Sequence, residues 1–252
     1  MSSNEPSTEL ATGALADSEP SPAKSRPQLR LHHFFALTAV AAVLLALNGP
    51  QQDHWTGSQF EPPRLIQTLF VALGVLYVLL LAVAITALAY GIVWQRMGME
   101  SFNQPGHWLV VAIAVTGLFA TVPTIIFRSL YSSVNFEVEF PMLAMVLMGI
   151  YSLIAVVALP LGLNIYIGLK KCREKRWSLI FYMKAVDYLL FGLGSIVIIA
   201  LLIIAVRRDR REQIPRDLSH WCGVSLQLAH SGLTCLSVIV SVANMYYMFN
   251  QM

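Results

Sequence analysis

The chain has 252 residues, of which 56% are hydrophobic and only 12% are charged, and its formal net charge is +3. A water-soluble domain of ordinary composition has about a quarter charged residues. So few charges can hardly cover a water-facing surface, which excludes an ordinary soluble domain. We therefore expect an integral membrane protein that is surrounded by the lipid bilayer, with no nucleic acid as a partner.

Residues 1–30 are rich in Ser, Pro, Ala and Glu and lack hydrophobic periodicity, so a disordered polar tail is predicted. Residues 31–252 are predicted to form one transmembrane helical domain, because apolar runs fill them and runs of about 18 or more residues are typical of bilayer spans. The predicted fold is an all-α, polytopic bundle of six spans. The spans are expected at about 31–48, 65–94, 108–127, 141–169, 188–206 and 224–249.

The charges beside the spans predict the orientation, because Lys and Arg are enriched in cytoplasmic loops. The tail and the loop at 170–176 are basic, whereas the loop at 50–63 has no Lys or Arg, which favours a cytoplasmic N-terminus in a plasma or inner membrane. The loop at 207–216 conflicts with this orientation, because it is rich in arginine and six alternating spans place it outside. Five crossings plus one re-entrant segment would put both basic loops inside, and this alternative stays open.

The last predicted span carries a stripe of polar residues. They recur at intervals of three and four, so they share one face of a helix. Such a face should point at other protein or at water. Two interpretations are open: hydrogen bonds that hold helices together, or one wall of a polar pathway in which His230 carries a proton or binds a ligand. The stripe consists of Gln227, His230, Thr234, Ser237, Ser241 and Asn244.

Small residues in the third predicted span recur every four positions, which predicts a helix-packing face because such residues let two backbones approach closely. This face consists of Ala112, Thr116, Ala120 and Thr124. Helix breaks are predicted at Pro123 in the third span and at Pro160 and Asn164 in the fourth. Proline removes a helical hydrogen bond. Such breaks either kink a helix or expose carbonyl oxygens that can bind an ion.

Two pairs of titratable residues are further candidates. Lys184 and Asp187 lie three apart just before a charge-free run, so they can form an intramembrane ion pair on one helix face. An ion pair at membrane depth indicates function, whereas one at the membrane interface is ordinary. His33 and His107 begin the first and third spans at the same membrane face, where two histidines could hold a haem or a metal ion.

Three functions are compatible with these patterns. The first, which the packing faces and short loops favour, is a non-catalytic accessory or assembly protein whose partners are other membrane proteins or a second copy. The second is a transporter or channel component for a small solute or a proton, which uses the polar stripe of the last span. The third is a haem or metal protein. An enzyme is disfavoured, because the chain has no zinc-protease, nucleophile-elbow or phosphate-loop motif.

Overall fold

A computed structural model describes residues 31–47, 63–97, 102–133, 150–151, 154–190 and 192–250. Throughout these residues the regular elements are helices, which confirms the predicted all-α class. The predicted disordered tail at 1–30 lies outside the described residues, as does most of the first third of the span predicted at 141–169.

Three helices correspond to the first three predicted spans. They are α1 (Leu31–Leu47), α2 (Arg64–Arg96) and α3 (Pro105–Ser133). Pro63 precedes α2 and Pro105 opens α3, which are positions where the missing backbone N–H of proline costs no helical hydrogen bond. The buried leucines and alanines of α2 pack between α1 on one side and α3 on the other.

The fourth predicted span is helical but changes its helix type twice. A π-helical turn, η2 (Ile154–Ala158), leads into α5 (Leu159–Tyr166), which ends in a second π-helical turn, η3 (Ile167–Lys171). Pro160 is the second residue after the first of these turns and lacks the N–H that a regular α-helix would use there. Asn164 is fully buried, and its side-chain amide donates to the carbonyl oxygen of Pro160 at 2.8 Å.

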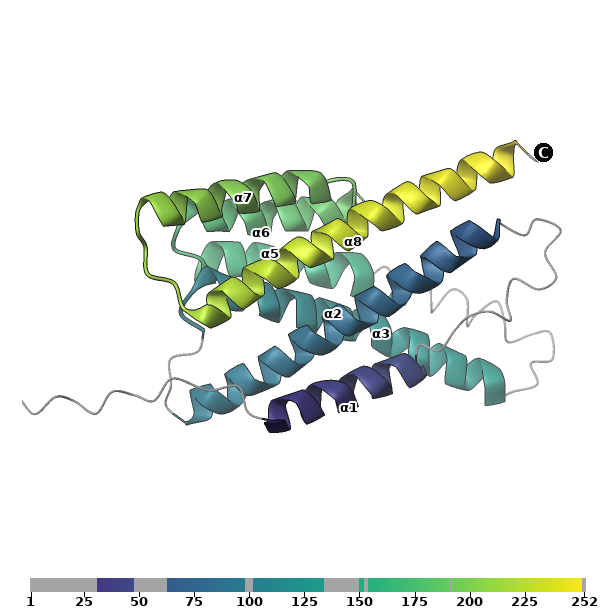
Figure 1. The fold of residues 1–252 in the computed structure, drawn as a ribbon, viewed down its shortest axis with the longest axis horizontal. Helices are drawn as coiled ribbons and strands as arrows, with labels where there is room; N and C mark the ends of the chain where they lie inside the picture. Colours follow the sequence, from purple (N-terminus) through teal and green to yellow (C-terminus); the bar gives the residue numbers. More distant parts are fainter. Residues whose placement is uncertain are drawn as a thin grey trace, which may run out of the picture.

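Two short helices, α6 (Lys175–Leu189) and α7 (Ser195–Arg211), form a hairpin between η3 and the last helix, α8 (Leu218–Phe249). The charged residues of α6 lower its hydropathy, which is why no span is predicted there. In the structure α6 runs back along α7 and packs against both α5 and α7 (Figure 1).

The first helix of the hairpin is shorter than a bilayer is thick. α6 has 15 residues, which is about 22 Å at 1.5 Å per residue. The hydrocarbon core of a bilayer is about 30 Å thick. At the tip of the hairpin, Gly192 contacts the side chain of Thr234, which lies halfway along α8. The hairpin therefore covers about half the length of α8.

Both basic loops lie at the same end of the molecule, because α6 begins where α7 ends (Figure 1). Ion pairs join them directly: Arg176 Nη2 lies 3.0 Å from Asp209 Oδ1, and Arg216 Nη2 lies 2.7 Å from Glu174 Oε1. Six alternating spans would separate these loops. Among the described residues, α2 and α8 are the helices long and apolar enough to cross a membrane, so the six-span prediction is not confirmed.

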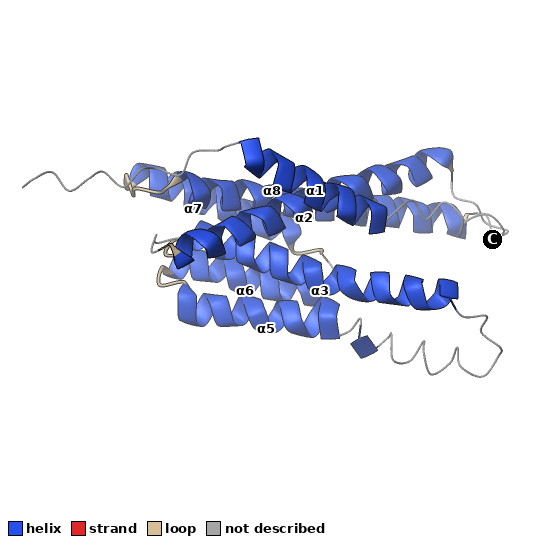
Figure 2. Ribbon diagram, turned by 90° about the horizontal axis from the view of Figure 1, so that it is seen from below, coloured by secondary structure: helices blue, strands red, loops and turns tan. Residues whose placement is uncertain are grey.

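The largest apolar core joins the hairpin to α3 and α8. Its most deeply buried members include Leu109 of α3, Trp177 and Phe181 of α6, and Ile198 and Leu202 of α7, each at most 1% exposed. α3, α5 and α6 lie in one layer, and α7 and α8 lie in another (Figure 2). This core holds the polar residues described next in fixed positions.

Candidate functional site

α3 and α8 begin in direct contact at the basic end. A Cβ atom added to Gly223 would overlap the carbonyl oxygen of Gly106, so glycine is required for this approach. The contact lets the Gly106 backbone N–H donate to Nδ1 of His220 at 3.0 Å. His220 is fully buried, and its ring packs edge-on against Trp177 and Trp221. Because Nδ1 accepts this bond, the neutral ring carries its proton on Nε2.

A serine, a histidine and an aspartate meet beside this contact. Asp217 is the N-cap of α8 and accepts from the His220 backbone N–H at 2.7 Å. His107 Nε2 lies 3.1 Å from Asp217 Oδ1 and 2.7 Å from Ser219 Oγ. In a catalytic triad the serine and the aspartate bind different ring nitrogens. Here both meet Nε2, so we interpret the group as a cap that ties α3 to α8.

A charged network lies next to the cap and is built around Asp209, which is fully buried in α7. Arg176 Nη2 lies 3.0 Å from its Oδ1, and Arg216 Nε donates to its Oδ2 at 2.9 Å. Glu174 accepts from both arginines as well. The network therefore fixes the two basic loops against each other.

The surroundings of two carboxyls in this region favour their ionised forms. Burial alone would raise the pKa of Glu174, but the hydrogen bonds from Arg216 and Arg176 outweigh it and hold the pKa below its ordinary value. Burial likewise opposes ionisation of Asp217, but the hydrogen bond from the His220 backbone and the charge of His107 lower its pKa. Both groups are therefore charged at neutral pH.

A second polar cluster lies deeper in the bundle, around Lys184 of α6. Lys184 is 2% exposed, and its Nζ donates to Oε1 of Gln227 at 2.5 Å. The Gln227 side-chain amide in turn donates to Ser231 Oγ at 3.0 Å. Gln227 lies about 14 Å along α8 from the first residue of that helix. The ammonium group is therefore well below the level of the basic loops.

Asp187 lies in the same cluster, one turn further along α6, and closes the hairpin tip. It accepts from Ser195 Oγ, the first residue of α7, at 2.7 Å. An acidic side chain at a helix N-terminus is favourable because the backbone N–H groups there carry partial positive charge. The backbone N–H of Gly192, whose φ is +90°, donates to the carbonyl oxygen of Asp187 at 3.0 Å. The bonds of Lys184 and Asp187 thus go to other helices, and no direct ion pair joins the two in the part of the chain that the structure describes.

Some donors and acceptors of this cluster have no hydrogen-bond partner among the described residues. An ammonium group has three donors, and that of Lys184 makes a single hydrogen bond to the described residues. Asp187 Oδ1 is buried and has no partner among them. Tyr188 Oη donates to Thr116 Oγ1 at 3.4 Å, and the rings of Tyr77 and His230 lie 5.8 Å apart. The polar side chains of this region thus come from five helices, and among the described residues Gln227 is the one that hydrogen-bonds directly to Lys184.

The structure divides the predicted polar stripe of α8. Gln227 is buried in the Lys184 cluster, whereas Thr234 contacts the hairpin tip. Beyond the tip Ser241 is exposed. The remaining members, His230, Ser237 and Asn244, are half-buried. Ser231 belongs to the cluster but is absent from the predicted set, although it follows Gln227 by four residues and so shares its face.

The predicted packing face lies inside the chain's own bundle where it is described. Ala112 is fully buried, and Thr116 is 6% exposed and donates to the Ala112 carbonyl oxygen at 2.6 Å. Ala120 is half-buried, and the side chain of Thr124 lies outside the described residues. The backbone of α3 stays helical through Pro123 to Ser133.

In the part of the chain that the structure describes, nothing places His33 and His107, the predicted haem or metal ligands, next to each other. The side chain of His33 lies outside the described residues, and Nε2 of His107 contacts Asp217 and Ser219. No group of three or more histidine, cysteine, aspartate or glutamate side chains that could hold a metal ion is found within the described ranges.

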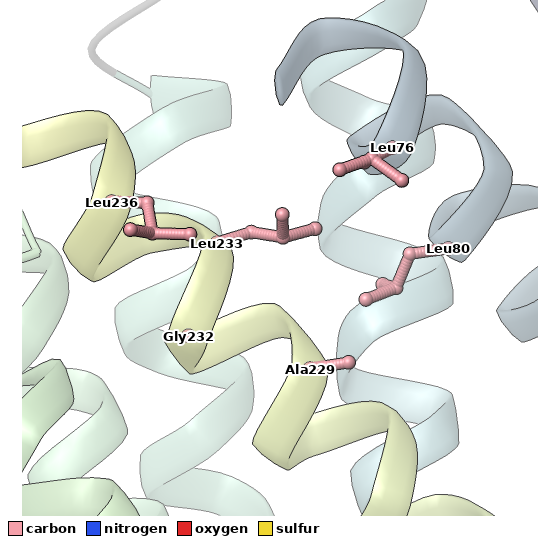
Figure 3. Close-up of a pocket in the computed structure, with 6 residues that line it drawn as sticks. All are labelled: Leu76, Leu80, Ala229, Gly232, Leu233 and Leu236. Atoms are coloured by element: carbon pink, nitrogen blue, oxygen red, sulfur yellow. The ribbon is translucent and has the colours of Figure 1, made fainter. Parts of the chain in front are cut away.

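A shallow apolar groove of about 380 Å³ runs between α2 and α8 (Figure 3). Its floor is open because Gly232 and Ala229 present almost no side chain to α2. The lining residues are Leu76, Leu80, Ala229, Gly232, Leu233 and Leu236. The groove has no charged or hydrogen-bonding side chain, so it suits an apolar occupant.

Searches for related proteins find none: no protein-family model, no curated protein and no solved structure matches the chain. Function must therefore be inferred from the two polar clusters and the groove themselves.

Proposed function

We propose that the chain is a polytopic membrane protein with five crossings and one re-entrant hairpin, α6–α7, and that its Lys184 cluster conducts protons. The topology is supported by the length of the hairpin and by the ion pairs that hold both basic loops at one end. By the positive-inside rule that end is cytoplasmic, together with the N-terminus of α1 (Figure 1). A plasma or inner membrane is the proposed location.

The observation that carries the proposed function is the burial of Lys184 against a neutral amide. A lysine inside a membrane protein is costly, and such residues mark ion and proton pathways. A protein that needed this position only for packing would be more stable with an apolar side chain there. The cost of burying the amine is therefore a sign that its chemistry is used.

A proton is favoured over a larger solute as the cargo. The polar groups in and next to the Lys184 cluster include hydroxyls, the imidazole of His230 and the carboxylate of Asp187, which can pass or hold protons. The groove that the described residues form is apolar and lies elsewhere, between α2 and α8. Conduction of a proton needs no solute-sized cavity at the cluster.

The test is proton flux into liposomes that contain the purified full-length protein and an internal pH-sensitive dye. A potassium diffusion potential drives the flux. We expect the wild type to acidify the lumen faster than protein-free liposomes, and Lys184→Met to abolish the difference. Lys175→Met is the matched control, because Lys175 is exposed at the start of the same helix. Wild-type flux at the protein-free level would refute the proposal, as would unchanged flux in Lys184→Met.

Assembly with another membrane helix is the second candidate function, and the groove between α2 and α8 favours it. Small residues such as Ala229 and Gly232 let a neighbouring helix approach closely. We expect Gly232→Leu to fill the groove and lower the fraction of oligomer captured by chemical crosslinking in membranes. An unchanged crosslinking pattern would show that the groove does not mediate assembly.

A further inference from the structure

The lysines and arginines of the two basic loops fall into two sets. In the first set are Arg176, Arg208 and Arg216, whose ion-pair partners are Glu174, Asp209 and Glu212. Three arginines face three carboxylates, so this network is electrically neutral. Its charges pair with one another and hold the two loops together. The network therefore has no net charge with which to attract an outside ligand.

The second set is exposed and forms no ion pair with the described residues. It comes from both basic loops, which the neutral network holds side by side. These seven residues are Lys170, Lys171, Arg173, Lys175, Arg207, Arg210 and Arg211. They concentrate uncompensated positive charge on one end of the molecule, and this surface is called the cation rim below.

The cation rim lies where the apolar outer surface of the bundle ends. On α7, Ile203 and Ile204 are 42% and 61% exposed, and Arg207 follows Ile203 by one turn on the same face. On η3, Leu169 is 65% exposed and directly precedes Lys170. Exposed isoleucine and leucine beside exposed lysine and arginine match the boundary between acyl chains and headgroups.

An aromatic ring strengthens this boundary. Lys171 Nζ lies 5.2 Å from the ring centroid of Trp108, which is half-buried at the start of α3. Tryptophan is enriched at headgroup level, where its ring is apolar and its N–H can bind water or lipid. The rim therefore combines charge and an interfacial aromatic at a single level of the bundle.

We propose that the cation rim binds the headgroups of anionic phospholipids in the leaflet at this end. This inference requires that the chain lies in a membrane but does not depend on proton conduction. The phosphate and the net negative charge of the lipid are the chemistry recognised. Clusters of lysine and arginine next to a membrane helix attract such lipids through the same charge interaction.

The test measures lipid selectivity at the protein surface. The full-length protein is reconstituted in phosphatidylcholine bilayers with a trace of spin-labelled phosphatidylglycerol or spin-labelled phosphatidylcholine, and the immobilised fraction is read by electron paramagnetic resonance. We expect phosphatidylglycerol to be preferred by roughly threefold or more, and high salt to remove most of the preference because exposed charges are screened.

Two triple variants separate charge from structure. Changing Arg207, Arg210 and Arg211 to Gln should lower the preference, whereas changing the same three to Lys should retain it. Arg64→Gln removes an exposed charge at the opposite end and should change nothing. A wild type without preference for phosphatidylglycerol refutes the proposal, and this outcome needs no variant to fold.

A soluble phosphate compound is the competing source of the same chemistry. Inorganic phosphate should displace the labelled lipid no better than chloride at equal ionic strength. Stronger displacement by phosphate would assign the rim to a soluble ligand and overturn the lipid proposal. Selectivity that survives the three glutamine substitutions would overturn it as well.

Discussion

Replacing Asp209 by Asn should weaken the junction between the two basic loops severely. Asp209 is fully buried, accepts a charge-assisted hydrogen bond from Arg216 and forms an ion pair with Arg176. A hydrogen bond to a charged group contributes about 1.5–3 kcal/mol. The asparagine keeps one acceptor oxygen, places an amide N–H₂ group against an arginine, and leaves the site without its charge. Glu174 still forms ion pairs with both arginines, although it offsets only one of their two charges, so the expected loss is about 2–4 kcal/mol, below the upper range for an unpaired buried charge.

The assay is equilibrium unfolding of the purified protein in mixed micelles with increasing dodecyl sulfate, followed by tryptophan fluorescence. Trp177 reports locally, because Arg216 lies over its ring. The control is Arg210→Gln, an exposed residue one position further along α7, which should change stability by less than about 0.5 kcal/mol. A loss below about 1 kcal/mol for Asp209→Asn would equal that of a surface ion pair and would refute the idea of a buried junction.

Two further predictions concern the same end of the bundle. Gly223→Ala should destabilise the protein by about 1–3 kcal/mol in the unfolding assay, because its methyl group would overlap the carbonyl oxygen of Gly106. Gly232→Ala is its control in the same helix, since nothing lies within 4 Å of the added Cβ, and equal losses in the two variants would contradict the steric account. Stability should also fall with acidification, because the lowered pKa values of Glu174 and Asp217 contribute stability that is present above their unfolded values of 4.5 and 3.8 and is lost as the pH falls through the folded values. Midpoints recorded between about pH 6 and pH 3 should show this decline, and Glu174→Gln should flatten it; an identical pH profile in the variant would exclude Glu174 as a source.

The elements that the sequence predicts well are those whose signal is local. Long uninterrupted apolar runs predict both ends of α2 and the C-terminal end of α8 to within a few residues. α6 is the opposite case, because Lys175, Arg176 and Lys184 make its sequence look like a loop. The buried charge of Lys184 is tolerated since its partner, Gln227, lies on another helix. No short segment of the sequence predicts such contacts, because the residues that form them are far apart along the chain.

The same distinction applies to the candidate site. Gln227 and Lys184 are both recognisable as polar residues near membrane depth, but the bond between them joins positions 43 residues apart. Asp209 gives no sequence signal, because its burial depends on Arg176 from another helix. The surplus of arginine in the loop at 207–216 conflicts with alternating spans and favours the re-entrant alternative, which stays a prediction.

The re-entrant hairpin is the central claim, and the sidedness of three positions tests it most directly. In a variant without Cys172, Cys222 and Cys235, single cysteines replace Arg173, Arg211 or Asn250, and sealed vesicles are treated with a membrane-impermeant maleimide from one side at a time. The proposed topology predicts that positions 173 and 211 are labelled from the same side and position 250 from the other. Labelling of 173 and 250 from one side and of 211 from the other would instead show six alternating spans and contradict the hairpin.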